Sequence, residues 1–188
     1  MEHRRRAILA AIALVSVLTA LTLGVAMLVP FPVELTGSLI AFSGTVEYVP
    51  PGQISRPLRP ESDTPLILEP GTRIILSEDA SATLAFDASR GRVIINGPTS
   101  LALVSLARRA TLPGHLFDWQ RVPRRFELTF EQSGGTASYV FDTNLFDAGL
   151  LKVTIRLPGT TFVPQQPCWS IVFGDKETPS VREYPCPS

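Results

Sequence analysis

Residues 66–106 read LILEPGTRIILSEDASATLAFDASRGRVIINGPTSLALVSL, and this stretch decides the fold. Short runs rich in Ile, Leu, Val and Thr alternate there with turn formers such as Pro70-Gly71 and Asn96-Gly97-Pro98. Runs of this kind are typical of strands, and the residues between them favour turns. The runs begin 6 to 10 residues apart, which leaves no room for helices. The expected strands cover 66–69, 72–77, 82–87, 92–96 and 100–106.

Five further runs extend the expected β-structure across most of the chain. Residues 38–49 should form a first strand pair, because Thr45 to Val49 alternate with the period of two that marks a half-buried strand. Gly134-Gly135 is a strong hairpin signal between two later strands. These later strands are expected at 125–131, 136–142, 151–157 and 169–173.

The pattern indicates an all-β domain, either a short-stranded β-roll or solenoid-like fold or a sandwich-like fold. The roll is preferred because the coils between Leu66 and Leu106 are so short. Residues 102–110 could instead make one helical turn. The segment 50–65 holds five prolines and Gly52, so it should be a Pro-rich surface loop without core residues.

The N-terminal region predicts one transmembrane helix at 7–29. These 23 residues include no charge, and 12 of them are Leu, Ile or Val. A helix of this length crosses a hydrocarbon core about 30 Å thick. A cleaved signal peptide is the alternative, but its apolar core is shorter and Val25-Ala26-Met27 fits a cleavage site poorly.

Charge predicts the orientation of this helix. Arg4, Arg5 and Arg6 precede it, whereas the next basic residue is Arg56, so the N-terminus should be cytoplasmic. The chain is therefore expected in the cell membrane, single-pass, with its C-terminal domain extracytoplasmic. The expected segments are a cytoplasmic tail 1–6, the helix 7–29, a linker 30–37, a β-domain 38–173 and a C-terminal tail 174–188.

The exported part is nearly neutral, with 14 Lys and Arg against 15 Asp and Glu beyond Leu35. It offers no broad basic field, so a nucleic-acid partner is not expected. Its two cysteines, Cys168 and Cys186, lie close together in sequence. An oxidising compartment would favour a disulfide between them.

Two patches of sequence resemble the FecR-like domain of bacterial signalling and envelope proteins. The first is 69–106, with Gly71 before an apolar run and the alternating Ala82, Leu84 and Phe86. The second joins GTASYVFD at 135–142 to KVTIRLPGTTFVP at 152–164. The resemblance implies a membrane-anchored β-domain with a sensing or scaffolding role.

One part of the FecR pattern is missing from this chain. The founding members bind a sigma factor through a cytoplasmic region, and their exported domain meets an outer-membrane receptor. Only Met1 to Arg6 are expected in the cytoplasm here, and six residues cannot form such a module. The resemblance therefore implies fold, location and binding, without direct control of transcription.

A sortase-like cysteine transpeptidase is the alternative function. Sortases are also anchored β-proteins, and Cys168, His115 and Arg182 would supply the thiolate, the residue that activates it and the oxyanion partner. However, PQQPCWS lacks the sortase strand Thr-Leu-x-Thr-Cys, and a lone His in a segment flanked by Pro-Gly is typical of an exposed loop. No catalytic residue is therefore assigned.

Other chemistry has little support in the sequence. Phe141-Asp142-Thr143-Asn144 is similar to the Asp-Thr-Gly of aspartic proteases, but the glycine is missing and Asp at a strand end commonly forms turns. Phosphate loops, nucleophile elbows and Cys-x-x-Cys or His-x-x-His pairs are absent. No cofactor and no metal site are expected.

Two surfaces remain candidates for partners. An arginine cluster interleaved with Phe117 and Trp119 could bind an anionic lipid or polymer, although a solvated loop is the preferred interpretation. Ser16, Ala20 and Gly24 stand four apart in the predicted helix, a spacing that allows a homodimer through close helix contact. The arginines of the cluster are Arg108, Arg109, Arg121, Arg124 and Arg125.

The sequence as a whole favours a non-catalytic binding, sensing or scaffolding module of the bacterial envelope. Its partner would be an envelope protein or polymer. A purely structural component of a larger complex is a third hypothesis.

Overall fold

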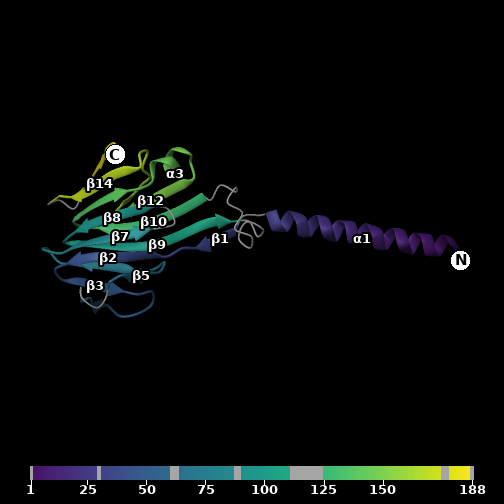
Figure 1. Ribbon diagram of the computed structural model, residues 1–188, viewed down its shortest axis with the longest axis horizontal. Coiled ribbons are helices and arrows are strands. Elements are labelled where there is room, and N and C mark those ends of the chain that lie inside the picture. Colours follow the sequence, from purple (N-terminus) through teal and green to yellow (C-terminus); the bar gives the residue numbers. More distant parts are fainter. Residues whose placement is uncertain are drawn as a thin grey trace. The chain divides into compact units, whose positions relative to one another are not determined.

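The computed structural model describes residues 2–28, 31–59, 64–86, 90–110, 125–174 and 178–186 (Figure 1). The chain forms two units, which we describe separately. The first contains the N-terminal helix, and the second contains the β-structure from Val33 to Arg108 and from Arg124 onward.

The N-terminal helix α1 spans Glu2–Leu28. It begins before residue 7, so the described part of the predicted tail 1–6 is helical. Between residues 12 and 25 every side chain is exposed, and the large aliphatic ones have 54–64% of their surface accessible. Thr19 and Thr22 donate their hydroxyls to the carbonyls of Val15 and Leu18, so their polar groups are satisfied within the helix.

Among the residues that the structure describes, no helix combines the length and the apolarity that a membrane span requires.

The β-structure consists of two sheets. The eight-stranded sheet has the order β13-β12-β10-β9-β6-β3-β4, and β1 pairs with β9 off this path. Its strands are β1 (Phe31–Glu34), β3 (Val46–Val49), β4 (Arg56–Pro57), β6 (Arg73–Leu76), β9 (Thr99–Ala110), β10 (Arg125–Ser133), β12 (Leu151–Leu157) and β13 (Thr160–Phe162).

The seven-stranded sheet has the order β15-β14-β11-β8-β7-β2-β5. Its strands are β2 (Gly37–Ser43), β5 (Leu66–Leu68), β7 (Ser81–Phe86), β8 (Gly91–Asn96), β11 (Thr136–Val140), β14 (Cys168–Phe173) and β15 (Pro179–Glu183). One short helix, α3 (Thr143–Asp147), lies between β11 and β12.

The prediction of an all-β domain is confirmed, and the sandwich-like alternative describes it better than the preferred roll. A roll would stack parallel coils, whereas most neighbouring strands here are antiparallel, and β10 and β12 form a parallel pair. The inner faces of both sheets supply one hydrophobic core. In this core the ring centroids of Phe86 on β7 and Phe130 on β10 lie 5.3 Å apart.

Two expected strand pairs are wrong. Gly134-Gly135 follows β10 and precedes β11, but these strands belong to different sheets, so the turn crosses the sandwich instead of closing a hairpin. A Cβ at Gly135 would lie 1.8 Å from the Thr99 hydroxyl and 2.6 Å from backbone oxygens, so this crossing requires glycine. β2 and β3, expected as a pair at 38–49, are likewise divided between the sheets.

Three segments expected to be irregular contain β-structure. The Pro-rich loop 50–65 includes β4, and Leu58 beside it is only 7% exposed, so the loop does contribute to the core. The linker 30–37 contains β1, and the tail 174–188 contains β15, which pairs with β14. β9 continues through residues 102–110, where a helical turn was the alternative.

A side-chain hydrogen bond in the core links two strands across the sandwich. Tyr139 on β11 donates its hydroxyl to Gln132 on β10 over 2.9 Å, and both side chains are fully buried. Burial raises the pKa of the Tyr139 phenol, because ionisation would leave a charge in an apolar interior. Tyr139 also stacks on Trp169, which positions β14 in the core.

Candidate functional site

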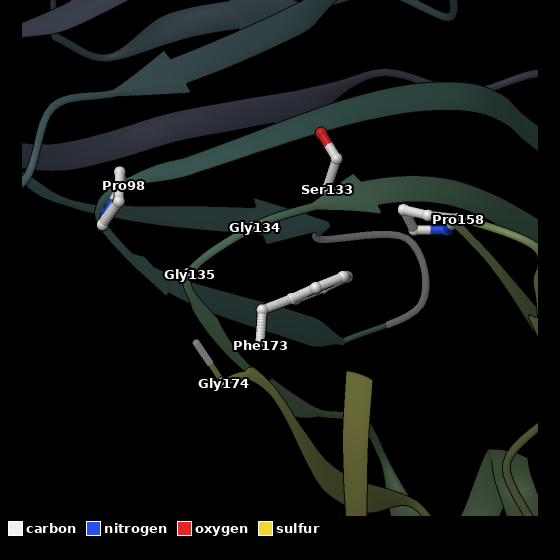
Figure 2. Close-up of a pocket in the computed structure, with 7 residues that line it drawn as sticks. All are labelled: Pro98, Ser133, Gly134, Gly135, Pro158, Phe173 and Gly174. Atoms are coloured by element: carbon white, nitrogen blue, oxygen red, sulfur yellow. The ribbon is translucent and has the colours of Figure 1, made fainter. Parts of the chain in front are cut away.

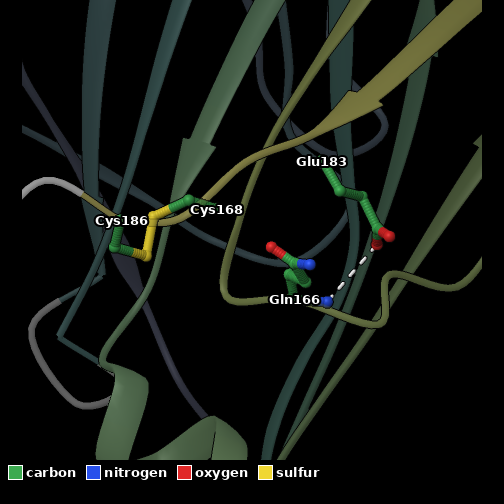
Figure 3. Close-up of a disulfide and its surroundings, with 4 residues drawn as sticks. All are labelled: Gln166, Cys168, Glu183 and Cys186. Atoms are coloured by element: carbon green, nitrogen blue, oxygen red, sulfur yellow. Dashed lines mark hydrogen bonds between the residues drawn. A yellow bond between two sulfur atoms is a disulfide. The ribbon is translucent and has the colours of Figure 1, made fainter.

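The two cysteines form a disulfide at the edge of the seven-stranded sheet (Figure 3). The Sγ atoms of Cys168 and Cys186 lie 1.99 Å apart. Cys168 begins β14 and is fully buried, and its carbonyl accepts a hydrogen bond from the Tyr184 amide over 3.0 Å. The bond therefore closes the chain around β15 and holds the residues that follow it against β14.

A second contact fixes the approach to β14. The Glu183 carboxylate accepts the backbone amides of Gln165, at 2.5 Å, and of Gln166, at 3.3 Å. Figure 3 shows the bond from Gln166. Charge-assisted bonds of this kind are stronger than neutral ones. The chain around Cys168 is therefore held to β15 in two ways. Glu183 on β15 binds the loop before Cys168, and the disulfide joins Cys168 to Cys186, just after β15.

The residues of the transpeptidase alternative are only partly brought together. Cys168 and Arg182 lie on the neighbouring strands β14 and β15. The Cys168 sulfur is bonded to Cys186, so it carries no thiol in this state. His115 lies outside the described residues.

Asp142 has a structural position at the start of α3. Its carboxylate accepts the Leu145 amide over 3.1 Å and forms an ion pair with Arg90 at 3.3 Å. The pKa of Asp142 is lowered, first because the Leu145 amide donates to the carboxylate and second because Arg90 contributes a further hydrogen bond. This is the arrangement of a helix N-cap.

Asp142→Ala is expected to lower the free energy of unfolding by about 1 kcal/mol, the usual cost of losing a cap. Asp142→Asn should cost less, because an amide oxygen can still accept the Leu145 amide. The part of the stabilisation by Asp142 that depends on its charge should be fully present above the ordinary Asp pKa of about 4. It should disappear as the pH falls through the lower pKa that Asp142 has in the folded state. Denaturant titrations at pH 7 and pH 3 measure this contribution. If Asp142→Asn lost as much free energy of unfolding between pH 7 and pH 3 as the wild type, the prediction would be wrong.

Three of the five arginines of the cluster lie among the described residues. Arg108 lies near the end of β9, and Arg125 begins its neighbour β10. The Arg108 Nε is buried and has no hydrogen-bond partner among the described residues. Arg109 and Arg125 are exposed, whereas Arg121 and Arg124 lie outside the described residues. Whether the five arginines form one surface stays a prediction.

The small residues of the predicted dimer face are all exposed on α1. Ser16, Ala20 and Gly24 follow one another at four-residue intervals, and a Cβ added at Gly24 would meet no atom within 4 Å. Space for a second helix is therefore present, and the homodimer stays a prediction.

Described residues of the β-domain line at least two hollows. The larger, about 650 Å³, is bordered by Pro98, the Gly134-Gly135 turn, Pro158 and Phe173 (Figure 2). The smaller, about 430 Å³, includes Tyr48, with the Arg56 guanidinium 5.2 Å from its ring centroid. Neither hollow is lined by a residue that the sequence suggested as a catalytic, disulfide or anion-binding candidate. Within the described part of the chain, no group of three His, Cys, Asp or Glu side chains is placed to hold a metal ion.

Comparison with models of protein families, with curated proteins and with solved structures found no match for this chain.

Proposed function

We propose that this chain is a membrane-anchored β-sandwich module that binds a partner in the bacterial cell envelope, as a sensor or scaffold, and performs no catalysis. The disulfide between Cys168 and Cys186 carries this proposal. Disulfides persist in oxidising compartments and are rare in the cytosol, which supports an extracytoplasmic location for the sandwich. A disulfide-bonded Cys168 also cannot act as a thiolate nucleophile.

The anchor is proposed from the N-terminal sequence, the uncharged run 7–29. The uncharged run 7–29 falls almost entirely within a continuous helix, Glu2–Leu28. Each described side chain from residue 12 to residue 25 is exposed, so the helix presents apolar groups on all sides. Such helices are stable when a membrane or another apolar environment covers them. The triple arginine before the run supports a cytoplasmic N-terminus.

Binding is favoured over catalysis by the construction of the domain. Large side chains from both sheets fill the core, which makes a rigid scaffold with two broad outer faces. The resemblance of 69–106, 135–142 and 152–164 to FecR-like domains supports the same function, since that family acts through protein contacts. The transpeptidase alternative would require a reduced Cys168 together with His115.

The full chain, produced in a bacterial host with an export pathway, is expected in the membrane pellet after alkaline carbonate extraction. Protease added to spheroplasts should digest the β-domain, and a thiol reagent should label neither cysteine until the protein is reduced. Leu18→Arg is the matched variant, since a charge at the helix centre costs about 2.5–3.5 kcal/mol on insertion. It should reduce the membrane-bound fraction.

Two results would overturn the proposal. A chain that is released by carbonate like a soluble protein has no anchor. A Cys168 thiol that reacts before reduction would instead favour the transpeptidase, and peptide-cleavage assays would then follow.

A further inference from the structure

The outer face of the eight-stranded sheet carries charges of both signs that compensate one another. Glu127 and Glu131 on β10 lie in register with Lys152 and Arg156 on β12. Glu131 also forms an ion pair with Arg73 on β6 at 3.4 Å. Opposite charges on neighbouring strands stabilise one another, and this pattern is typical of a solvated face.

The outer face of the seven-stranded sheet has a different composition. Strand register places hydroxyl, aliphatic and amide side chains on this face, and Ile67, Ile94 and Val172 are its exposed large aliphatic residues. Its only charged side chains within the described strands are Arg92 on β8 and Arg182 on β15, and no Asp or Glu of those strands points outward. We call this surface the hydroxyl face. Its central members are Thr83, Arg92, Ile94, Thr136, Ser138, Ser170, Val172, Ser180 and Arg182.

Many hydroxyls of this face are free to bind a ligand. Ser43 and Ser81, at one end, bond to each other over 2.9 Å. The hydroxyls of Ser138, Ser170 and Thr83 make no hydrogen bond with the described residues. They stand on adjacent or nearby strands, and neighbouring strands lie about 4.8 Å apart. Since a hydroxyl both donates and accepts, the face offers a row of groups suited to a polyhydroxylated ligand.

Arg92 and Arg182 favour a ligand that carries negative charges at two separate positions. Arg92 and Arg182 are both exposed. Their strands are separated by β11 and β14, which places the two Cα positions roughly 15 Å apart from strand spacing. Asp142, just beyond the end of β11, is already bound by Arg90 and the Leu145 amide. One small anion cannot reach both arginines, so the face fits an extended polyanion.

We propose that the hydroxyl face binds an acidic polysaccharide, an extended chain of hydroxylated rings with repeated carboxylates. The carboxylates would pair with Arg92 and Arg182, and the ring hydroxyls would bond to the serine and threonine side chains between them. This inference rests on the proposed function, because it names the partner class of the exported module.

The same observations disfavour two other occupants. In a symmetric dimer through this face, each copy would present arginines to a surface without carboxylates in its strands. A lipid surface favours clustered aliphatic or aromatic side chains. Here Ile94 lies between Thr83 and Ser138, and Val172 between Thr136 and Ser180.

The test measures binding of the full chain in neutral detergent to polygalacturonate, with dextran as the uncharged control. Polygalacturonate should bind and dextran should bind at least tenfold more weakly. Arg92→Gln and Arg182→Gln should each weaken binding about tenfold, and raised salt should weaken wild-type binding more than that of the double variant. Thr83→Val, which preserves shape, should weaken it a few-fold.

Lys152→Gln and Arg156→Gln are the matched controls, because they remove exposed cations from the opposite face. Their binding should equal that of the wild type. Equal losses on both faces, or no loss with Arg92→Gln and Arg182→Gln, would overturn the inference. Arginine-dependent binding to phosphatidylglycerol vesicles without binding to polygalacturonate would also overturn it, in favour of lipid. Each of these failures leaves the proposed function intact if the chain remains carbonate-resistant and its cysteines unlabelled.

Discussion

Trp169→Ala is expected to lower the free energy of unfolding of the β-domain by about 3–5 kcal/mol, the usual cost of truncating a buried Trp. The Trp169 ring is fully buried and stacks between Tyr139 and Phe141, with centroids at 5.2 and 5.5 Å. Phe162 contacts it edge-on at 6.4 Å. Truncation would remove these contacts and leave a cavity between the sheets. Urea unfolding followed by circular dichroism measures the loss.

Trp169→Phe is the informative comparison for this prediction. The indole Nε1 is buried without a hydrogen-bond partner in the described part of the chain, so replacing it removes no bond. Phe also retains an aromatic ring between Tyr139 and Phe141. The variant should therefore lose much less stability than Trp169→Ala. If the two variants lost the same free energy of unfolding, the phenyl ring would not be replacing the stacking contacts of the indole, and the prediction would be wrong.

Cys186→Ser is expected to lower the free energy of unfolding by about 3 kcal/mol, because the bond with Cys168 closes a loop of 18 residues. A cross-link of this length restricts the unfolded chain, and its removal restores that freedom. The loss of stability should appear first at β15, because among the described strands it is an edge strand that pairs only with β14 in its sheet. Hydrogen exchange of β15 and β14 amides would locate it.

Reduction of the wild type provides the control for the disulfide. Wild type with reductant should match Cys186→Ser, and reductant should not change the variant further. The paired amides of Gln165 and Gln166 on Glu183 should keep β15 partly attached after reduction. A stability unchanged by reduction would show that packing and this carboxylate alone hold the edge strand.

The sequence predicts most strands correctly because their signal is local. Alternating residues such as Ala82, Leu84 and Phe86 point into the core, as the period of two requires. The division of strands between sheets depends on tertiary packing, which no local signal contains. Gly134-Gly135 therefore indicates a reversal of the chain, but whether the next strand pairs with β10 or crosses to the other sheet is decided by the core.

Short or irregular elements escaped prediction for related reasons. β4 and β13 contain two and three residues, too few to show a period. β15 includes a proline and two charged residues, as edge strands often do, so its composition is typical of a tail.

The candidate site shows the same division between local and tertiary information. The cysteine pair follows from composition and compartment, and the structure contains that bond. The hydroxyl face was not visible in the sequence, because Thr83, Ser138 and Ser170 are far apart and individually ordinary. A count of charged residues on each alternate position of the strands would have separated the two faces. That count also requires knowing which strands share a sheet.

The separation of consecutive strands into different sheets affects how quickly the domain can form. β2 pairs with β7, so Ser38 must find Ala85, 47 residues further along the chain. Similarly, β3 can pair with β6 only once β6 is available, and β10 can pair with β12 only once β12 is available. Because chain closure over such separations precedes any stabilising contact, domains of this kind fold in milliseconds to seconds instead of microseconds. Export that begins at the first strands of the domain, with the N-terminus retained in the cytoplasm as proposed, would expose these strands until their distant partners arrive, which makes the period of export the time of greatest risk of aggregation.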